Sequence, residues 1–143
     1  MNAEAGRPAT AMQLLERMFD VEIRFLQDAT SDVGLLASAF HPDVTIHEPE
    51  TLPYAGDWTK RAGVAALFQR MREVWSQVSV EGLRAVRQDA MAHMYCTISL
   101  TARDNGATIR QPFAEVLRFE GERLIDGTPF YFDTAAIVAA LGK

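Results

Sequence analysis

The sequence predicts an α+β protein in which helices pack against a curved antiparallel sheet. In the first half, apolar residues recur at helical spacing, whereas from Val78 onward they alternate with polar residues, as is typical of strands. Two turn signals, "RDNGAT" and "FEGERL", divide this second half into a meander of long strands. Helices set against an antiparallel sheet define the α+β class. A sheet curved around a helix layer leaves a cone-shaped hollow, and such hollows hold ligands.

Composition limits the class of protein. The chain has 143 residues and a net charge of −5. This length predicts a single domain over residues 10–143, after a flexible tail over residues 1–9. The acidic balance argues against nucleic acid as a partner, because phosphate binding needs clustered Lys and Arg. The longest apolar run, 135–141, is too short to span a membrane, so no membrane partner is expected. The single cysteine, Cys96, fits a reducing cytoplasm and is expected to be a buried packing thiol.

Three helices are expected before the meander. The first begins with a capping box, Thr10 and Gln13, and has an apolar stripe: Leu14, Leu15, Met18, Phe25 and Leu26. A short second helix over residues 33–40 is closed by His41-Pro42. The third, from about Thr59, has the stripe Val64, Leu67, Phe68, Met71 and Trp75.

The remaining segments are expected to be strands, one loop and a final helix. Residues 44–48 predict a short strand, and "PETLPYAGDW" predicts a loop because two prolines and a glycine interrupt any period. In "MAHMYCTISLTA" the alternation places Met94, Cys96, Ile98 and Leu100 on one face and His93, Tyr95, Thr97 and Ser99 on the other. Asp133 is expected to cap a last, short helix.

The stretch "TIHEPE" contains the first candidate site. His47 and Glu48 are neighbours on a strand, so their side chains point to opposite faces. Glu48 shares the more apolar face with Val44 and Ile46 and is expected to point into the hollow. His47 is expected to face the helix side, the loop or a partner subunit.

A second carboxylate interrupts an apolar row. Glu115 shares one strand face with Phe113, Leu117 and Phe119. A carboxylate buried without a partner costs several kcal/mol, so the protein must pair it, protonate it or use it. Two such acids in one cavity would titrate together, as a general base and a proton donor require.

Pairing interactions are the structural alternative for both acids. Glu48 could form a salt bridge with Arg61 or cap the following loop. Glu115 could face outward and pair with Arg103 or Arg110 across the hairpin.

With these elements in this order, the chain resembles the superfamily that includes nuclear transport factor 2, the ketosteroid isomerases and the SnoaL-type polyketide cyclases. The resemblance covers nearly the whole chain from about Thr10. It rests on "FHPDVTIHEPETLPYAG", "DWTKRAGVAALF", "FAEVLRFEGERL" and "FYFD", in that order. This fold hosts enzymes, binding modules and structural proteins alike.

The resemblance assigns roles to the two acids. The isomerases carry their general base just before a proline, which corresponds here to Glu48. Their protonated acid, which stabilises the enolate, corresponds to Glu115. In these isomerases the environments of the two acids set their pKa values apart, so that one acts as a base and the other stays protonated. The isomerase tyrosine would fall near Ile23 or Arg24, and the first helix has no tyrosine. Limonene epoxide hydrolases end in a similar segment, but Phe130 replaces one of their catalytic acids.

Two function hypotheses follow. The first is a cofactor-independent isomerase, cyclase or dehydratase acting on a small apolar carbonyl compound, with Glu48 and Glu115 as catalytic acids. The second is a non-catalytic ligand-binding or dimerisation module, with His93, Tyr95 and Thr97 in the interface of a homodimer. The expected ligand contacts are His47, Tyr54, Trp58, Phe113 and Phe130. No cofactor and no metal are expected, because His47 and Glu48 diverge and zinc needs three or four convergent ligands.

Overall fold

The protein is described here from a computed structural model, in which residues 8–28 and 33–143 are described. Most of the expected tail, and the segment between the first two helices, therefore lie outside the described residues. The elements in chain order are α1 (Ala11–Gln27), the 3-10 helix η2 (Val33–Ser38), β1 (Phe40–Glu48), β2 (Gly56–Thr59), α2 (Lys60–Val74), β3 (Trp75–Gln88), β4 (Met91–Ala102), β5 (Thr108–Glu120), β6 (Arg123–Tyr131) and α3 (Thr134–Ala140).

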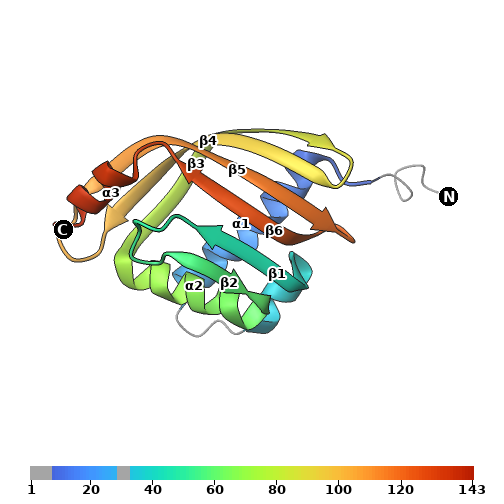
Figure 1. Ribbon diagram of the computed structural model, residues 1–143, viewed down its shortest axis with the longest axis horizontal. Helices are drawn as coiled ribbons and strands as arrows, with labels where there is room; N and C mark the ends of the chain where they lie inside the picture. Colours follow the sequence, from blue (N-terminus) through green and yellow to red (C-terminus); the bar gives the residue numbers. More distant parts are fainter. Residues whose placement is uncertain (1–7, 29–32) are drawn as a thin grey trace.

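The strands form one curved, unclosed sheet of six strands in the order β2-β1-β6-β5-β4-β3 (Figure 1). Neighbouring strands are antiparallel, except that β1 runs parallel to β6. This confirms the predicted α+β class, with the difference that the sheet is mixed. The parallel pair arises because β2 and α2 lead the chain from β1 to β3 at the far edge of the sheet, and the meander then returns to β1.

The helix and hairpin signals are confirmed in detail. Thr10 and Gln13 form the capping box at the start of α1, with Thr10 Oγ1 accepting from the Gln13 amide at 3.1 Å. Asp133 caps α3 by accepting from the Ala136 amide. The turn after β4 contains Gly106 at a φ of 72°, a backbone conformation that suits glycine. The capping and turn chemistry is local, which is why sequence alone could predict it.

Four expectations about where elements begin and end are wrong. The second helix ends at Ser38, and β1 begins at Phe40 rather than at Val44. Pro42 is tolerated there because the β1–β6 register shifts between Phe40 and Thr45, and prolines in sheets occupy such irregular positions. The expected loop contains β2, whose four residues pair with the end of β1. Trp75 is the first residue of β3 and not part of the third helix.

The core lies between the concave face of the sheet and the helices. The buried row on β4 is the one that alternation predicted, and it includes Cys96, which is fully buried. Phe68 on α2 packs its ring against Phe25 of α1 and Phe40 of β1, with centroids 5.9 and 5.8 Å apart. These contacts leave one part of the concave face unfilled, beside α1. Among the described residues, no helix is long and apolar enough to cross a membrane.

Candidate active site

A narrow cavity lies between α1 and the concave face of the sheet. Its volume is about 40 Å³, counted as the space open to the centres of water-sized molecules. One water needs roughly 10–15 Å³ on this scale, so the cavity has room for about three. Its wall is formed by apolar and aromatic side chains, three glutamates and one tyrosine: Met18, Phe19, Glu22, Ile23, Leu26, Phe40, Ile46, Glu48, Phe68, Met71, Val78, Val80, Ile98, Phe113, Glu115, Leu124, Pro129 and Tyr131.

Both predicted acids line this cavity. Glu48 at the end of β1 is 8 % exposed, and Glu115 in the middle of β5 is 7 % exposed. None of the three salt bridges expected as alternatives, Glu48 with Arg61 and Glu115 with Arg103 or Arg110, forms. The Arg61 guanidinium donates instead to the main-chain carbonyls of Phe40 and Ala37.

Arg110 on β5 pairs with Glu81 on β3, across the intervening strand β4. Arg103 donates to the carbonyls of Arg72 and Trp75, where α2 ends and β3 begins. Glu115 cannot pair with Arg110, because the two residues are five positions apart on β5 and so point to opposite sides of the sheet. The Arg103 guanidinium is bound to main-chain carbonyls instead.

A third acid, Glu22 on α1, also lines the cavity and was not predicted. Its side chain is partly buried, between the sheet and the neighbouring turns of the helix. The sequence does carry a signal for it. Glu22 is four residues after Met18 and four before Leu26, so it lies within the apolar stripe of α1. A charged residue at such a stripe position faces the interior.

Burial raises the pKa of all three acids. It raises the pKa of Glu22 from 4.5 to about 7. Burial, and then repulsion from Glu22, raises the pKa of Glu48 to about 8, against a smaller lowering by a hydrogen bond from Tyr131. Burial, Glu22 and Glu48 together raise the pKa of Glu115 well above its usual range. The three carboxyls therefore titrate as one coupled group, and most of them are protonated at neutral pH.

One oxygen of Glu48 has no partner. Among the buried side-chain atoms of the described residues, Oε1 of Glu48 is the one that accepts no hydrogen bond. The carboxyl does interact with the Tyr131 side chain. An unpaired buried acceptor costs free energy, and in native proteins such atoms are concentrated where function needs them.

Two tyrosines connect Glu48 to the core. Trp75 Nε1 donates to the Tyr54 hydroxyl at 3.1 Å, and the Tyr54 and Tyr131 hydroxyls are 3.2 Å apart. Indole nitrogen can only donate and an ionised carboxylate can only accept. The chain of hydrogen bonds therefore runs in one direction, from Trp75 through both hydroxyls to ionised Glu48. Burial raises the pKa of each tyrosine, so both remain protonated donors.

Gly127 makes room for Glu115. A Cβ atom at this position would lie 2.9 Å from Oε2 of Glu115, which is closer than a carbon and an oxygen approach. Gly127 is on β6, opposite Leu117 of β5 and Ile46 of β1. The carboxyl of Glu115 is therefore seated against bare backbone at the centre of the sheet.

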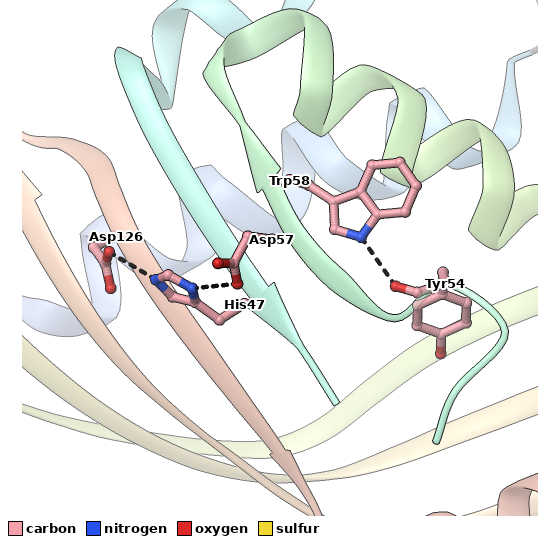
Figure 2. Close-up of polar contacts among 5 residues, drawn as sticks. All are labelled: His47, Tyr54, Asp57, Trp58 and Asp126. Atoms are coloured by element: carbon pink, nitrogen blue, oxygen red, sulfur yellow. Dashed lines mark hydrogen bonds and ion pairs between the residues drawn. The ribbon is translucent and has the colours of Figure 1, made fainter. Parts of the chain in front are cut away.

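His47 lies on the opposite face of β1 from Glu48. Its Nδ1 is 2.7 Å from Asp57 Oδ1 on β2, and its Nε2 is 3.0 Å from Asp126 Oδ2 on β6 (Figure 2). These hydrogen bonds, that to Asp126 first, raise the pKa of His47. As expected, His47 points away from the hollow, and it contacts β2 and β6 rather than the helices. The expected ligand contact is wrong for this cavity, since His47 is not among the residues that line it.

The other expected ligand contacts are divided between the two sides of the sheet. Phe113 lines the cavity and packs its ring against Tyr131, with centroids 5.0 Å apart. Tyr54 is fully buried behind the cavity, where only its hydroxyl extends toward Tyr131. Trp58 donates from Nε1 to the Tyr54 carbonyl (Figure 2), and so anchors the loop to β2. Phe130 is 53 % exposed on the outer face, and its neighbour Pro129 lines the cavity instead.

The acids do not form a metal site. Across the described part of the chain, no group of three or more His, Cys, Asp or Glu residues is placed to hold a metal ion. Cys96 is also unsuited to ligation or nucleophilic attack, because burial and then Glu115 raise the pKa of its thiol to about 11. What the cavity offers is proton transfer by carboxyl groups.

Comparison with known families agrees with this architecture. The model of the SnoaL-like domain matches residues 15–126, which include most of α1, all of α2 and all three cavity glutamates. The chain belongs to the SnoaL-like domain family. Among curated protein sequences, none matches it.

Solved structures show the same fold at low sequence identity. An NTF2-like protein of unknown function from Burkholderia pseudomallei is 20 % identical with a TM-score of 0.79, covering 95 % of this chain and 100 % of its own. TerC, co-crystallised with polyporic acid, is 17 % identical with a TM-score of 0.72, covering 91 % and 98 %. A protein of ketosteroid isomerase-like fold from Catenulispora acidiphila, in complex with trimethylamine, is 14 % identical with a TM-score of 0.67, covering 87 % and 92 %.

Proposed function

We propose that this SnoaL-like protein is a cofactor-independent acid–base enzyme of the isomerase or cyclase type, acting on a small carbonyl compound. The observation that carries the proposal is the pair of buried glutamates, Glu48 and Glu115, which line one apolar cavity without a basic partner. A cavity that only binds apolar ligands gains nothing from buried, unpaired acids, since each costs stability. Enzymes place such groups where proton transfer needs a shifted pKa.

The two acids have different roles in this proposal. Ionised Glu48 takes a proton from the carbon next to the carbonyl, and the electron pair of the C–H bond moves to the carbonyl oxygen. Glu115, whose pKa burial keeps well above the usual range, stays protonated and donates a hydrogen bond to that oxygen. Returning the proton from Glu48 to another carbon completes an isomerisation. In a cyclisation the enolate carbon instead attacks a second carbonyl carbon, whose oxygen takes the electron pair of its C=O bond and then the proton from Glu48.

The pH dependence has a defined sign. Glu48 must be ionised to act as a base, and burial raises its pKa to about 8. The rate is therefore expected to rise with pH through the neutral range and to level off above about pH 8. The Tyr131 hydroxyl, which donates to Glu48, favours the ionised form and holds the carboxylate in place.

The test is proton exchange and isomerisation of small ketones. 3-Cyclohexenone in deuterated buffer, followed by NMR and by ultraviolet absorbance, reports both abstraction of the proton and formation of the conjugated product. Glu48→Gln is expected to lower the rate by about 10²-fold or more, whereas Glu50→Gln, two residues on and exposed, retains it. Full activity of Glu48→Gln would remove this residue from the role of base.

The alternative is a cavity that binds a small molecule without changing it. Two structural neighbours were crystallised with small molecules, polyporic acid and trimethylamine, which supports ligand binding in either case. The two hypotheses differ in one respect: a binding module would hold the ligand without exchanging its carbon-bound protons. Binding of a ketone with no exchange above the buffer rate would favour this alternative.

A homodimer is proposed for the outer face of the sheet. Tyr95 and Phe130 are 45 % and 53 % exposed there, and both lie beside Ala114 on β5. The Arg84 guanidinium lies over the Tyr95 ring, 5.6 Å from its centroid. Tyr95→Glu is expected to give a monomer by analytical ultracentrifugation, while Gln88→Glu, with the same change of charge on β3, leaves the dimer intact. A wild-type protein that stays monomeric at high concentration would refute the dimer.

A further inference from the structure

The ionisable groups that line the cavity are acidic. Glu22 comes from α1, Glu48 from β1 and Glu115 from β5, and no Lys, Arg or His among residues 8–28 and 33–143 lines the same cavity. The other titratable groups beside the three acids are Tyr54, Tyr131 and Cys96, and none of them is cationic. Within the described part of the chain, a ligand is therefore the remaining source of positive charge inside the cavity.

The wall also has the two features that recognise an organic cation. Oε1 of Glu48 is a buried acceptor with no donor, and a charged N–H donor makes a stronger hydrogen bond to carboxylate than a neutral one. Aromatic rings form much of the surrounding surface: Phe19, Phe40, Phe68, Phe113 and Tyr131. Their faces attract ammonium groups, and a carboxylate with several aromatic rings is a common setting for quaternary ammonium ligands.

We infer that the cavity takes a small organic cation, a protonated or quaternary amine, in preference to a neutral or anionic molecule of the same shape. The inference rests on the proposed function in one respect, that this cavity is the substrate site, and it defines the substrate as a carbonyl compound that carries an amine. Met18 and Met71 lie in the wall, and the flexibility of their side chains allows a cavity this narrow to widen around a ligand of several atoms.

Binding of a cation displaces a proton. A cavity that holds one ammonium group and one carboxylate is electrically neutral. When all three acids are protonated, the cavity has no negative charge to pair with the ammonium group. Glu22, with a pKa of about 7, is the first to ionise as pH rises. The affinity for a cation therefore rises with pH, in proportion to the ionised fraction.

The groove next to the cavity has the opposite charge. It is lined by Arg72 and Arg103, and it shares Ile23, Leu26 and Val78 with the cavity wall. The Arg103 guanidinium is held by the carbonyls of Arg72 and Trp75. These arginines line the groove and not the cavity, so they do not neutralise the three acids.

A matched ligand pair tests the inference. Choline and 3,3-dimethylbutan-1-ol have the same shape and differ by one positive charge, and their binding can be followed by calorimetry or NMR from pH 5.5 to 7.5. Choline affinity is expected to rise on the order of 25-fold over this range, the change in the ionised fraction of a group with a pKa of about 7. The neutral alcohol is expected to bind more weakly at pH 7.5 and to show no such rise.

The control variants are equally matched. Glu22→Gln/Glu48→Gln/Glu115→Gln makes the cavity neutral and should abolish the preference for choline, while a thermal unfolding curve verifies that it folds. Glu16→Gln/Glu50→Gln/Glu120→Gln removes three exposed acids from corresponding places on α1, after β1 and on β5, and should bind choline like the wild type.

Failure of the cation inference and failure of the proposed catalysis give different experimental results. Equal binding of both ligands, or choline affinity that falls with pH, would overturn the inference even if Glu48-dependent exchange of 3-cyclohexenone persists. The pH-dependent choline preference without any such exchange would overturn the proposed catalysis and leave the inference standing.

Discussion

His47 and Glu48 are neighbours in sequence, and the two faces of β1 give them opposite environments. Outside, His47 is 36 % exposed in its side chain and lies between two carboxylates, Asp57 and Asp126. Inside, Glu48 is 8 % exposed and lies near two other acids, with one oxygen unpaired. Both groups have raised pKa values, for different reasons. Partner charges favour the ionised form of the histidine, whereas burial disfavours the ionised form of the glutamate.

The difference separates stabilising from functional charge. The outer cluster satisfies its own charges and needs no ligand. The inner cluster leaves an acceptor and a set of like charges uncompensated, which lowers the stability of the folded state. Natural proteins tolerate such a cost mainly where activity depends on it. Measurements on the two faces should therefore give effects of different size, largest at high pH for Glu48 and at low pH for His47.

The largest expected effect is on the inner face. Because burial raises the pKa of Glu48 from 4.5 to about 8, the folded protein binds its proton more tightly than the unfolded chain. The stabilisation is complete below pH 4.5 and is lost as pH rises through about 8. Denaturant unfolding should show the free energy of unfolding of the wild type falling from pH 5 to 9.

Replacement of Glu48 should reduce this fall of the unfolding free energy with pH. Glu48→Gln is expected to be more stable than the wild type at pH 9 by roughly 2–4 kcal/mol, with a smaller difference at pH 5. The exposed Glu50→Gln variant should stay within about 0.5 kcal/mol of the wild type at both pH values. A wild-type stability that rises from pH 5 to 9 would show that Glu48 is not a buried, uncompensated acid.

An intermediate effect is expected for the hydrogen bonds behind the cavity. Tyr54→Phe removes the hydroxyl that accepts from Trp75 and contacts Tyr131, and leaves the buried indole N–H without an acceptor. The expected loss of unfolding free energy is about 1–3 kcal/mol. Tyr95→Phe, on the outer face, should change it by less than about 0.5 kcal/mol. Equal losses in the two variants would mean that burial does not distinguish the two hydroxyls.

The smallest effect is expected for His47→Gln. The pKa of His47 is raised above 6.5 by Asp126 and Asp57, so its stabilisation is present below pH 6.5 and is lost as pH rises through the folded value. The side chains involved are exposed enough for solvent to screen them, so the loss at pH 6 should not exceed about 1 kcal/mol. At pH 9 the variant and wild type should be equally stable, and His93→Gln serves as the exposed control.

The alternation of side chains along strands predicted that Glu48 and Glu115 point inward, because a period of two follows from strand backbone geometry alone. The same reasoning applied to α1 could have identified Glu22, which lies within a helical apolar stripe. The strand β2 was not predictable in this way. Its four residues have no apolar alternation, and they become a strand because β1 offers them a free edge.

The sequence by itself determined the class of fold, the main elements and the faces of the two predicted acids. Each of these depends on local backbone geometry and on residues close together along the chain. The tertiary structure alone decided that Glu22, Glu48 and Glu115 share one cavity, and that His47 meets Asp126 across 79 positions of sequence. Such meetings depend on the register of β1 against β6 and the packing of α1 on the sheet. Both are set by long-range contacts, which no local pattern in the sequence encodes.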